Sequence, residues 1–185
     1  MILALIVIAA TLTFLALIQN LNFRYPWWVG APLTMGAYGI FHQLYDHILW
    51  QLHAGPIALS QIPDVSGVWV GMLTSSYNSG TEINVVFYIR QTWSKIAIRI
   101  ETAHSTSSTI MVALSSKDTS VPNLYYECIS EPGANASPLL QIHHDIGHLS
   151  LSSDGKTFAG EYYAGRDGII HGTFYTLLQK KAYHT

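Results

Sequence analysis

The sequence predicts two N-terminal transmembrane α-helices followed by an all-β domain, an eight-stranded up-and-down lipocalin-like β-barrel. Three observations lead to this prediction. Residues 1–54 form two apolar spans joined by a short aromatic turn. Residues 62–181 are short alternating runs rich in Tyr, Ile, Val and Thr, and turn-forming residues separate these runs at the spacing of an all-β barrel.

Composition excludes several functional classes. Apolar residues make up 49% of the chain and charged residues 11%, against about 25% charged residues in soluble domains. The net charge of −2 provides no basic surface for a duplex nucleic acid. Cys128 is the single cysteine, so the chain has no disulfide framework, and we interpret it as a small buried hydrophobe.

We predict four parts in the chain: a two-helix transmembrane hairpin at residues 1–54, a linker at 55–64, the barrel at 65–181 and a tail at 182–185. The first apolar span, residues 1–18, would be about 27 Å long as a helix, which is close to the hydrocarbon thickness of a bilayer. It lacks the basic start and the small-residue cleavage site of a signal peptide.

The second span, from about residue 29 to residue 49, is less apolar than the first. His42 and Asp46 are four residues apart and share a helix face, which suits a self-association surface or a pore lining. The alternative is that Asp46 and its neighbour His47 lie at the headgroup level. Arg24 in the turn between the spans, taken alone, would place the barrel outside the cell.

Turn-forming residues divide the rest of the chain into eight predicted strands. We expect these strands at residues 66–74, 82–91, 95–103, 107–115, 123–131, 139–151, 157–163 and 169–180. Sequential strands with short connections favour an up-and-down barrel, which leaves no exposed edge and can hold one small ligand. We expect Trp69, in the opening Ser66-Gly67-Val68-Trp69, to close one end of the barrel.

Enzyme signatures are mostly absent: the sequence has no GxSxG, HExxH, glycine-rich phosphate loop or dinucleotide fingerprint, so we predict no catalytic residue, no metal and no cofactor. His143, His144, Asp145 and His148 form one cluster of potential metal ligands. On a strand, His143 and Asp145 point to one face and His144 to the other, so a metal site would need a bulge at Gly147. We therefore interpret these histidines as side chains on a partly exposed strand.

Aromatic, cationic and hydroxyl side chains gather in three blocks. The blocks are residues 88–95, Tyr125-Tyr126, and Tyr162-Tyr163 with Arg166. Nucleobases stack on aromatic faces and arginine binds phosphate, so a barrel opening lined in this way suits a compact nucleotide. The alternative is ordinary β-propensity, because tyrosine and tryptophan are common in strands.

Several of these motifs are shared with a known family. They are Ser66-Gly67-Val68-Trp69, Arg90-Gln91-Thr92-Trp93-Ser94-Lys95-Ile96, Glu101-Thr102 with the run from Ser105 to Ser108, Glu131-Pro132, and Tyr162-Tyr163-Ala164-Gly165-Arg166 leading to Gly172. With these motifs and its paired spans, the chain resembles the two-transmembrane β-barrel effectors of CBASS over almost its full length. CBASS are bacterial cyclic-oligonucleotide antiphage systems, and these proteins belong to the CD-NTase-associated effectors.

The resemblance implies a receptor for a cyclic dinucleotide that a partner cyclase (CD-NTase) makes after phage infection. Binding would promote homo-oligomerisation through the transmembrane helices, with His42 and Asp46 on the assembling surface, and would disrupt the inner membrane and kill the cell. The resemblance also implies a cytoplasmic barrel, against the indication from Arg24. The ligand contacts that it implies are Arg90, Thr92, Trp93, Tyr126, Glu131, Tyr162 and Arg166.

Two other functions remain open from the residues alone. A membrane-tethered lipocalin-like carrier of an apolar ligand would have an apolar interior and would tolerate the loss of Arg166. A structural or assembly protein would have a barrel packed solid with side chains and would bind no small ligand.

Overall fold

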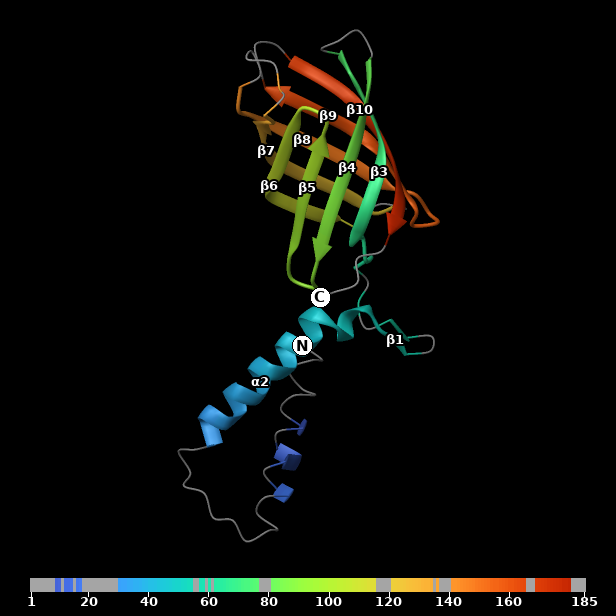
Figure 1. Ribbon diagram of the computed structural model, residues 1–185. Coiled ribbons are helices and arrows are strands. Elements are labelled where there is room, and N and C mark those ends of the chain that lie inside the picture. Colours follow the sequence, from blue (N-terminus) through green and yellow to red (C-terminus); the bar gives the residue numbers. More distant parts are fainter. Residues whose placement is uncertain are drawn as a thin grey trace. The chain divides into compact units, whose positions relative to one another are not determined.

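A computed structural model shows the chain as two compact units, residues 1–59 and residues 60–185 (Figure 1). The structure describes residues 9–10, 12–14, 16–17, 30–54, 57–58, 60, 62–76, 81–115, 121–134, 136, 141–165 and 169–180. The first predicted transmembrane span lies mostly outside these residues.

The first unit contains a helix and a short hairpin. Its elements are α2 (Gly30–His47), the 3₁₀-helix η2 (Leu49–Gln51), β1 (His53–Ala54) and β2 (Ile57–Ala58). Helix α2 occupies most of the second predicted span, and its proline, Pro32, lies in the first turn, where the backbone N–H groups have no helical acceptor in any case. None of the helices in the described part of the chain combines the length and the hydropathy that crossing a bilayer requires.

The second unit is a closed barrel of eight antiparallel strands, in which neighbours in sequence are neighbours in the sheet and β10 closes the ring against β3 (Figure 1). The strands are β3 (Gly67–Ser75), β4 (Thr81–Gln91), β5 (Ile96–Thr102), β6 (Ser105–Ser115), β7 (Asn123–Pro132), β8 (His143–Leu151), β9 (Thr157–Gly165) and β10 (Ile169–Lys180). The predicted eight-stranded up-and-down barrel is confirmed.

The predicted strand ends differ from the observed ones by a few residues. Strand β6 begins at Ser105, two residues before the predicted start, because Thr102 Oγ1 accepts the backbone N–H of Ser105 (3.0 Å) and closes a tight turn. Strand β8 begins at His143 instead of residue 139. Before this strand, the carbonyl oxygen of Gln141 lies 2.9 Å from Nδ1 of His143.

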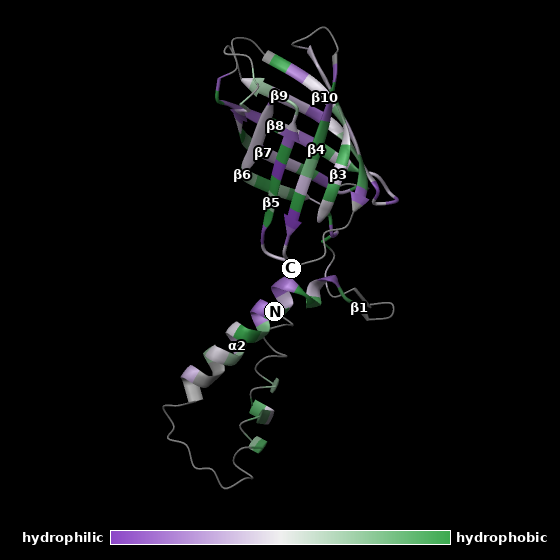
Figure 2. Ribbon diagram, in the orientation of Figure 1, coloured by the Kyte–Doolittle hydropathy of each residue, from purple (hydrophilic) through white to green (hydrophobic). Residues whose placement is uncertain are grey.

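Alternation along the strands divides the barrel side chains into an inner and an outer set. Ile98 and Ile100 are buried, whereas Arg99 between them is exposed, as the sequence pattern predicts. Figure 2 shows the same alternation of apolar and polar residues along the other strands. The buried apolar side chains of the barrel are Val65, Trp69, Leu73, Val85, Phe87, Ile89, Ile98, Ile100, Leu124, Tyr126, Cys128, Leu149, Leu151, Phe158, Tyr162, Ala164 and Phe174.

The end of the barrel where β3 begins, which we name the tryptophan end, is closed by apolar packing. Trp69 is fully buried, its ring centroid lies 4.4 Å from that of Phe158, and its Nε1 donates to the carbonyl of Val65 (3.0 Å). The buried side chain of Gln91 accepts the N–H of Val65 (2.8 Å) and donates to the carbonyl of Pro63 (3.0 Å). These two bonds hold the segment before β3 across this end.

Candidate functional site

A row of tyrosine and glycine residues crosses the inner wall of the barrel. Tyr126 of β7 pairs with Gly147 of β8, Gly147 pairs with Tyr162 of β9, and Tyr162 pairs with Gly172 of β10. Both tyrosine side chains face inward and are buried, with exposed fractions of 3% for Tyr126 and 8% for Tyr162. Four neighbouring strands therefore contribute to one aromatic layer.

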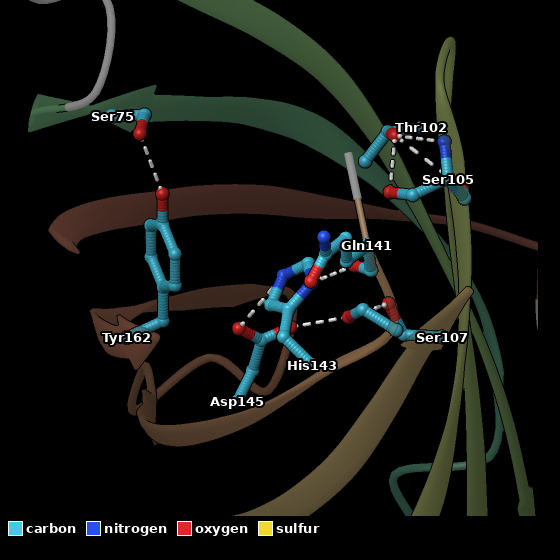
Figure 3. Close-up of polar contacts among 9 residues, drawn as sticks. Ser75, Thr102, Ser105, Ser107, Gln141, His143, Asp145 and Tyr162 are labelled. Atoms are coloured by element: carbon cyan, nitrogen blue, oxygen red, sulfur yellow. Dashed lines mark hydrogen bonds and ion pairs between the residues drawn. The ribbon is translucent and has the colours of Figure 1, made fainter. Parts of the chain in front are cut away.

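The two glycines of this row make room for the tyrosine rings. A Cβ atom at Gly147 would lie 2.1 Å from Tyr126 Cζ, and one at Gly172 would lie 2.3 Å from Tyr162 Cε1. Each ring therefore occupies the space that a side chain on the next strand would fill. The hydroxyl of Tyr162 reaches over β10 and donates to Ser75 Oγ of β3 (2.8 Å), which fixes the direction of that ring (Figure 3).

Two phenylalanines of the apolar core pack against the aromatic layer. The ring centroid of Phe174 lies 5.1 Å from that of Tyr162, and the ring centroid of Phe87 lies 6.3 Å from that of Tyr126 in an edge-on arrangement. Edge-on and tilted ring pairs at these separations are favourable. The aromatic layer thus borders the apolar half of the interior on one side.

Polar side chains occupy the inner wall at the opposite end of the barrel, where β8 begins, which we name the aspartate end. Ser130 Oγ donates to Asp145 Oδ2 and therefore accepts from Ser107 Oγ (2.6 Å). His143 places its Nε2 3.4 Å from Asp145 Oδ1 and its Nδ1 2.9 Å from the carbonyl oxygen of Gln141. Figure 3 shows this network, which joins β6, β7 and β8.

Burial changes the ionisation of the groups on this inner wall. It raises the pKa of the Asp145 carboxyl, although the hydrogen bond from Ser130 acts in the opposite direction. Burial also raises the pKa of the Tyr162 and Tyr126 phenols, and it raises the pKa of the Cys128 thiol to about 12. The phenols and the thiol are therefore neutral near pH 7.

Two of the seven predicted ligand contacts, Tyr126 and Tyr162, lie inside the barrel in the aromatic layer. A third, Arg166, falls outside the described residues. It follows Gly165, the last residue of β9, and precedes Ile169, the first residue of β10, and both of these strand ends belong to the aspartate end.

The other four predicted contacts lie elsewhere on the barrel. Arg90 of β4 and Glu131 of β7 are exposed on the outer face. Thr92 and Trp93 belong to the turn between β4 and β5 at the tryptophan end, where Thr92 Oγ1 accepts the N–H of Lys95 (3.2 Å). The structure therefore does not bring the seven predicted residues together.

Arg90 contributes to a separate groove along β3, β4, β5 and β6, with a volume of about 510 Å³. Tyr88, Arg99 and Glu101 also line this groove, and Arg99 Nη2 lies 2.7 Å from Glu101 Oε1. The guanidinium of Arg99 is thus paired with a neighbouring carboxylate.

The two residues predicted to act in membrane assembly, His42 and Asp46, both lie on α2 in the first unit. The Asp46 side chain is mostly buried within the described part of the chain, and the Nδ1 of His47 lies 3.7 Å from Asp46 Oδ2. The same His47 Nδ1 contacts the carbonyl oxygen of Gln43 (3.0 Å), so the polar residues at the end of α2 form one local cluster.

The polar network at the aspartate end is absent from the contacts predicted from the sequence. The predicted alternation of His143 and Asp145 on one face and His144 on the other is confirmed. The pattern does not show that the face shared by His143 and Asp145 is the inner one, because carboxylates are normally exposed. The available signal was the pair of small hydroxyl residues, Ser107 and Ser130, which lie opposite each other on β6 and β7.

The family model described as Cap15, cyclic dinucleotide receptor domain, matches residues 60–177 of the chain. This segment begins before β3 and ends within β10, so it covers the aromatic layer and the polar network. No curated protein matches the chain at a significant level of similarity. The family match confirms the resemblance to the β-barrel effectors of CBASS, and its description is that of a receptor.

Proposed function

The chain belongs to the Cap15 cyclic dinucleotide receptor family, and we propose that its barrel binds a cyclic dinucleotide on the inner wall at the aspartate end. The aromatic layer of Tyr126 and Tyr162 beside the Ser107–Ser130–Asp145 network is the observation that supports this position.

The chemistry of this wall suits nucleobases and ribose. Aromatic faces stack on any base, and each stacked base contributes about 1–3 kcal/mol. The hydroxyls of Ser107 and Ser130 and the carboxyl of Asp145 are the hydrogen-bonding groups that a base edge or a ribose requires. A carrier of an apolar ligand would leave Asp145 Oδ1, which has no hydrogen-bond partner among the described residues, unsatisfied in a buried site. The polar wall therefore favours the nucleotide over the apolar ligand.

We assign recognition of the phosphates to Arg166. A guanidinium binds phosphate through two parallel N–H···O bonds, and the strand ends that flank Arg166 belong to the aspartate end. Bases would then face the inner wall and phosphates would face the β9–β10 connection.

We propose further that the whole chain is a CBASS effector at the bacterial inner membrane, with its barrel in the cytoplasm and its ligand supplied by a partner cyclase. The apolar N-terminal sequence and the family resemblance support this role. A ligand that binds an assembling form more tightly shifts the balance toward the oligomer by that difference in affinity. Confinement to a membrane raises the effective concentration of the barrels, and assembly of the N-terminal helices would then disrupt the bilayer.

A calorimetric titration of the purified full-length chain tests the proposal. The ligands are cyclic dinucleotides with all pairings of the four RNA bases. We expect saturable binding of at least one of them, and we expect Arg166→Ala to abolish that binding while the circular dichroism spectrum stays unchanged. Arg99→Ala, in the groove along β3, β4, β5 and β6, is the matched control and should bind as the wild type does. A folded chain that binds none of these ligands would refute the proposed function.

A further inference from the structure

The imidazole of His143 is held between two oxygen atoms. Its Nδ1 lies 2.9 Å from the carbonyl oxygen of Gln141, and a carbonyl oxygen can only accept a hydrogen bond, so Nδ1 carries a proton. Its Nε2 lies 3.4 Å from Oδ1 of Asp145. That oxygen is buried and has no hydrogen-bond partner among the described residues.

The tautomer of His143 determines whether Nε2 carries a proton that it can donate to Asp145. A neutral imidazole has one N–H group, and Gln141 takes it, so Nε2 of the neutral ring is a bare acceptor. Asp145 Oδ2 already accepts from Ser130, and Oδ1 faces Nε2. Two bare acceptors facing each other in a buried site are unfavourable. A single proton, on Nε2 or on Oδ1, converts the contact into a favourable one.

We propose that His143 and Asp145 share one proton and that this proton is taken up when the barrel binds its anionic ligand. The inference rests on the proposed function. A cyclic dinucleotide carries two negatively charged phosphodiesters, and an unprotonated pair would add a third negative charge on the inner wall. Like charges in a poorly hydrated site repel strongly, whereas the protonated pair has no net charge. The protonated His143–Asp145 pair therefore favours binding of an anionic ligand, and the unprotonated pair disfavours it.

The other titratable groups that face Asp145 in the described part of the chain do not account for such an effect. Tyr126 and Cys128 of β7 and Tyr162 of β9 have raised pKa values, so they stay neutral at pH values where the pair titrates. His144 lies on the outer face of β8, where its Nδ1 is 3.1 Å from the carboxylate of Glu127. His144 therefore acts on Asp145 only through a long-range electrostatic interaction.

Calorimetry of the full-length chain at several pH values tests the inference. The probe is the cyclic dinucleotide that binds most tightly in the panel above, and each titration is repeated in two buffers with different ionisation enthalpies. We expect the affinity to fall as the pH rises, by at most about tenfold per pH unit because one proton is linked. The two buffers should report uptake of up to one proton per ligand bound.

Two variants test whether the His143–Asp145 pair, and not another group, causes the proton uptake and the pH dependence of binding. Asp145→Asn keeps an oxygen that accepts from Ser130 but removes the ligand-facing carboxyl, so it should bind more weakly, and the binding that remains should take up no proton and vary little with pH. Asp154→Asn, in an exposed turn at the tryptophan end, should keep the wild-type pH dependence. If Asp145→Asn does not fold, the two-buffer measurement on the wild type still decides the question.

The outcomes distinguish this inference from the proposed function. Binding with constant affinity and no proton uptake would overturn the shared proton alone. Absence of binding to every cyclic dinucleotide at every pH would overturn both. Proton uptake that persists in Asp145→Asn would assign the proton to another group and would also overturn the inference.

Discussion

Asp145 makes the stability of the barrel depend on pH. Burial raises the pKa of its carboxyl above the usual value of 3.8, so the folded chain binds a proton that the unfolded chain releases between the two pKa values. The stabilising contribution is complete below the unfolded pKa and is lost as the pH rises through the folded pKa. We expect the free energy of unfolding of the wild type to fall relative to that of Asp145→Asn across this window, in urea titrations at a series of pH values.

Asp154 should change the free energy of unfolding with pH in the opposite direction to Asp145, in the same urea titrations. A hydrogen bond from Ser152 and the backbone N–H of Lys156 lower the pKa of Asp154, so its contribution is lost as the pH falls. The difference between the wild type and Asp154→Asn should therefore shrink toward low pH. Parallel stability curves for the wild type and Asp145→Asn would show that burial does not control the Asp145 carboxyl.

The substitution Gly147→Ala should destabilise the barrel. The new Cβ would lie 2.1 Å from Tyr126 Cζ, so the ring has to move out of a packed layer. Overpacking of this kind costs about 1–3 kcal/mol. Thermal unfolding followed by circular dichroism measures the effect, and Gly165→Ala is the matched control because, chain neighbours aside, no atom of the described residues lies within 4 Å of its added Cβ. Equal melting temperatures for the two variants would contradict the role assigned to Gly147.

Single residues of the site were predictable to different degrees. The sequence motifs indicate which segments matter, but the face of each strand decides which side chains meet. Ile89 and Gln91 face inward, so Arg90 between them faces outward, although it belongs to the most specific shared motif. Asp145 was not predicted as an inner residue, because carboxylates are normally exposed and its partner, Ser130 of the neighbouring strand, meets the carboxyl only once the barrel is formed.

At the scale of the elements, Gln91 joins β4 to the segment before β3. Removing its amide in Gln91→Ala leaves the buried N–H of Val65 and the carbonyl of Pro63 without these partners. We expect a loss of about 1–3 kcal/mol in the free energy of unfolding, measured by urea titration. Asn84→Ala, at an exposed position of the same strand, is the control and should change the stability much less. A comparable loss in both variants would refute the bridging role.

The eight strands were predictable because alternation and turn residues are local signals. The strand ends were less predictable, because they depend on side-chain bonds to the backbone such as that of Thr102 to Ser105. Helix α2 (Gly30–His47) agrees with the helix expected near residues 29–49. Whether it crosses a membrane stays a prediction, because that property belongs to the lipid environment as well as to the sequence.

At the scale of the whole molecule, the proposed function separates ligand binding from membrane disruption. We expect the double substitution His42→Leu and Asp46→Leu to leave cyclic dinucleotide binding unchanged and to weaken killing, because polar groups on α2 would meet each other or water in the assembled state. The measurement is the viability of cells that also express a cyclase producing the ligand. Met35→Leu, an exposed apolar position on the same helix, is the control. Full killing by the double variant would exclude these residues from the assembly.

The pairing of β10 with β3 has a consequence for how the protein is made. Gly172 pairs with Ser75, so the seam joins segments from near the two ends of the barrel sequence. Pairings between distant segments form late, because a long loop has to close first. During translation, β3 leaves the ribosome long before β10, and the ring cannot close until the final strand has emerged. A nascent chain therefore has no complete inner wall, and a second messenger already present in the cell would meet a complete receptor domain only after β10 has emerged and paired with β3.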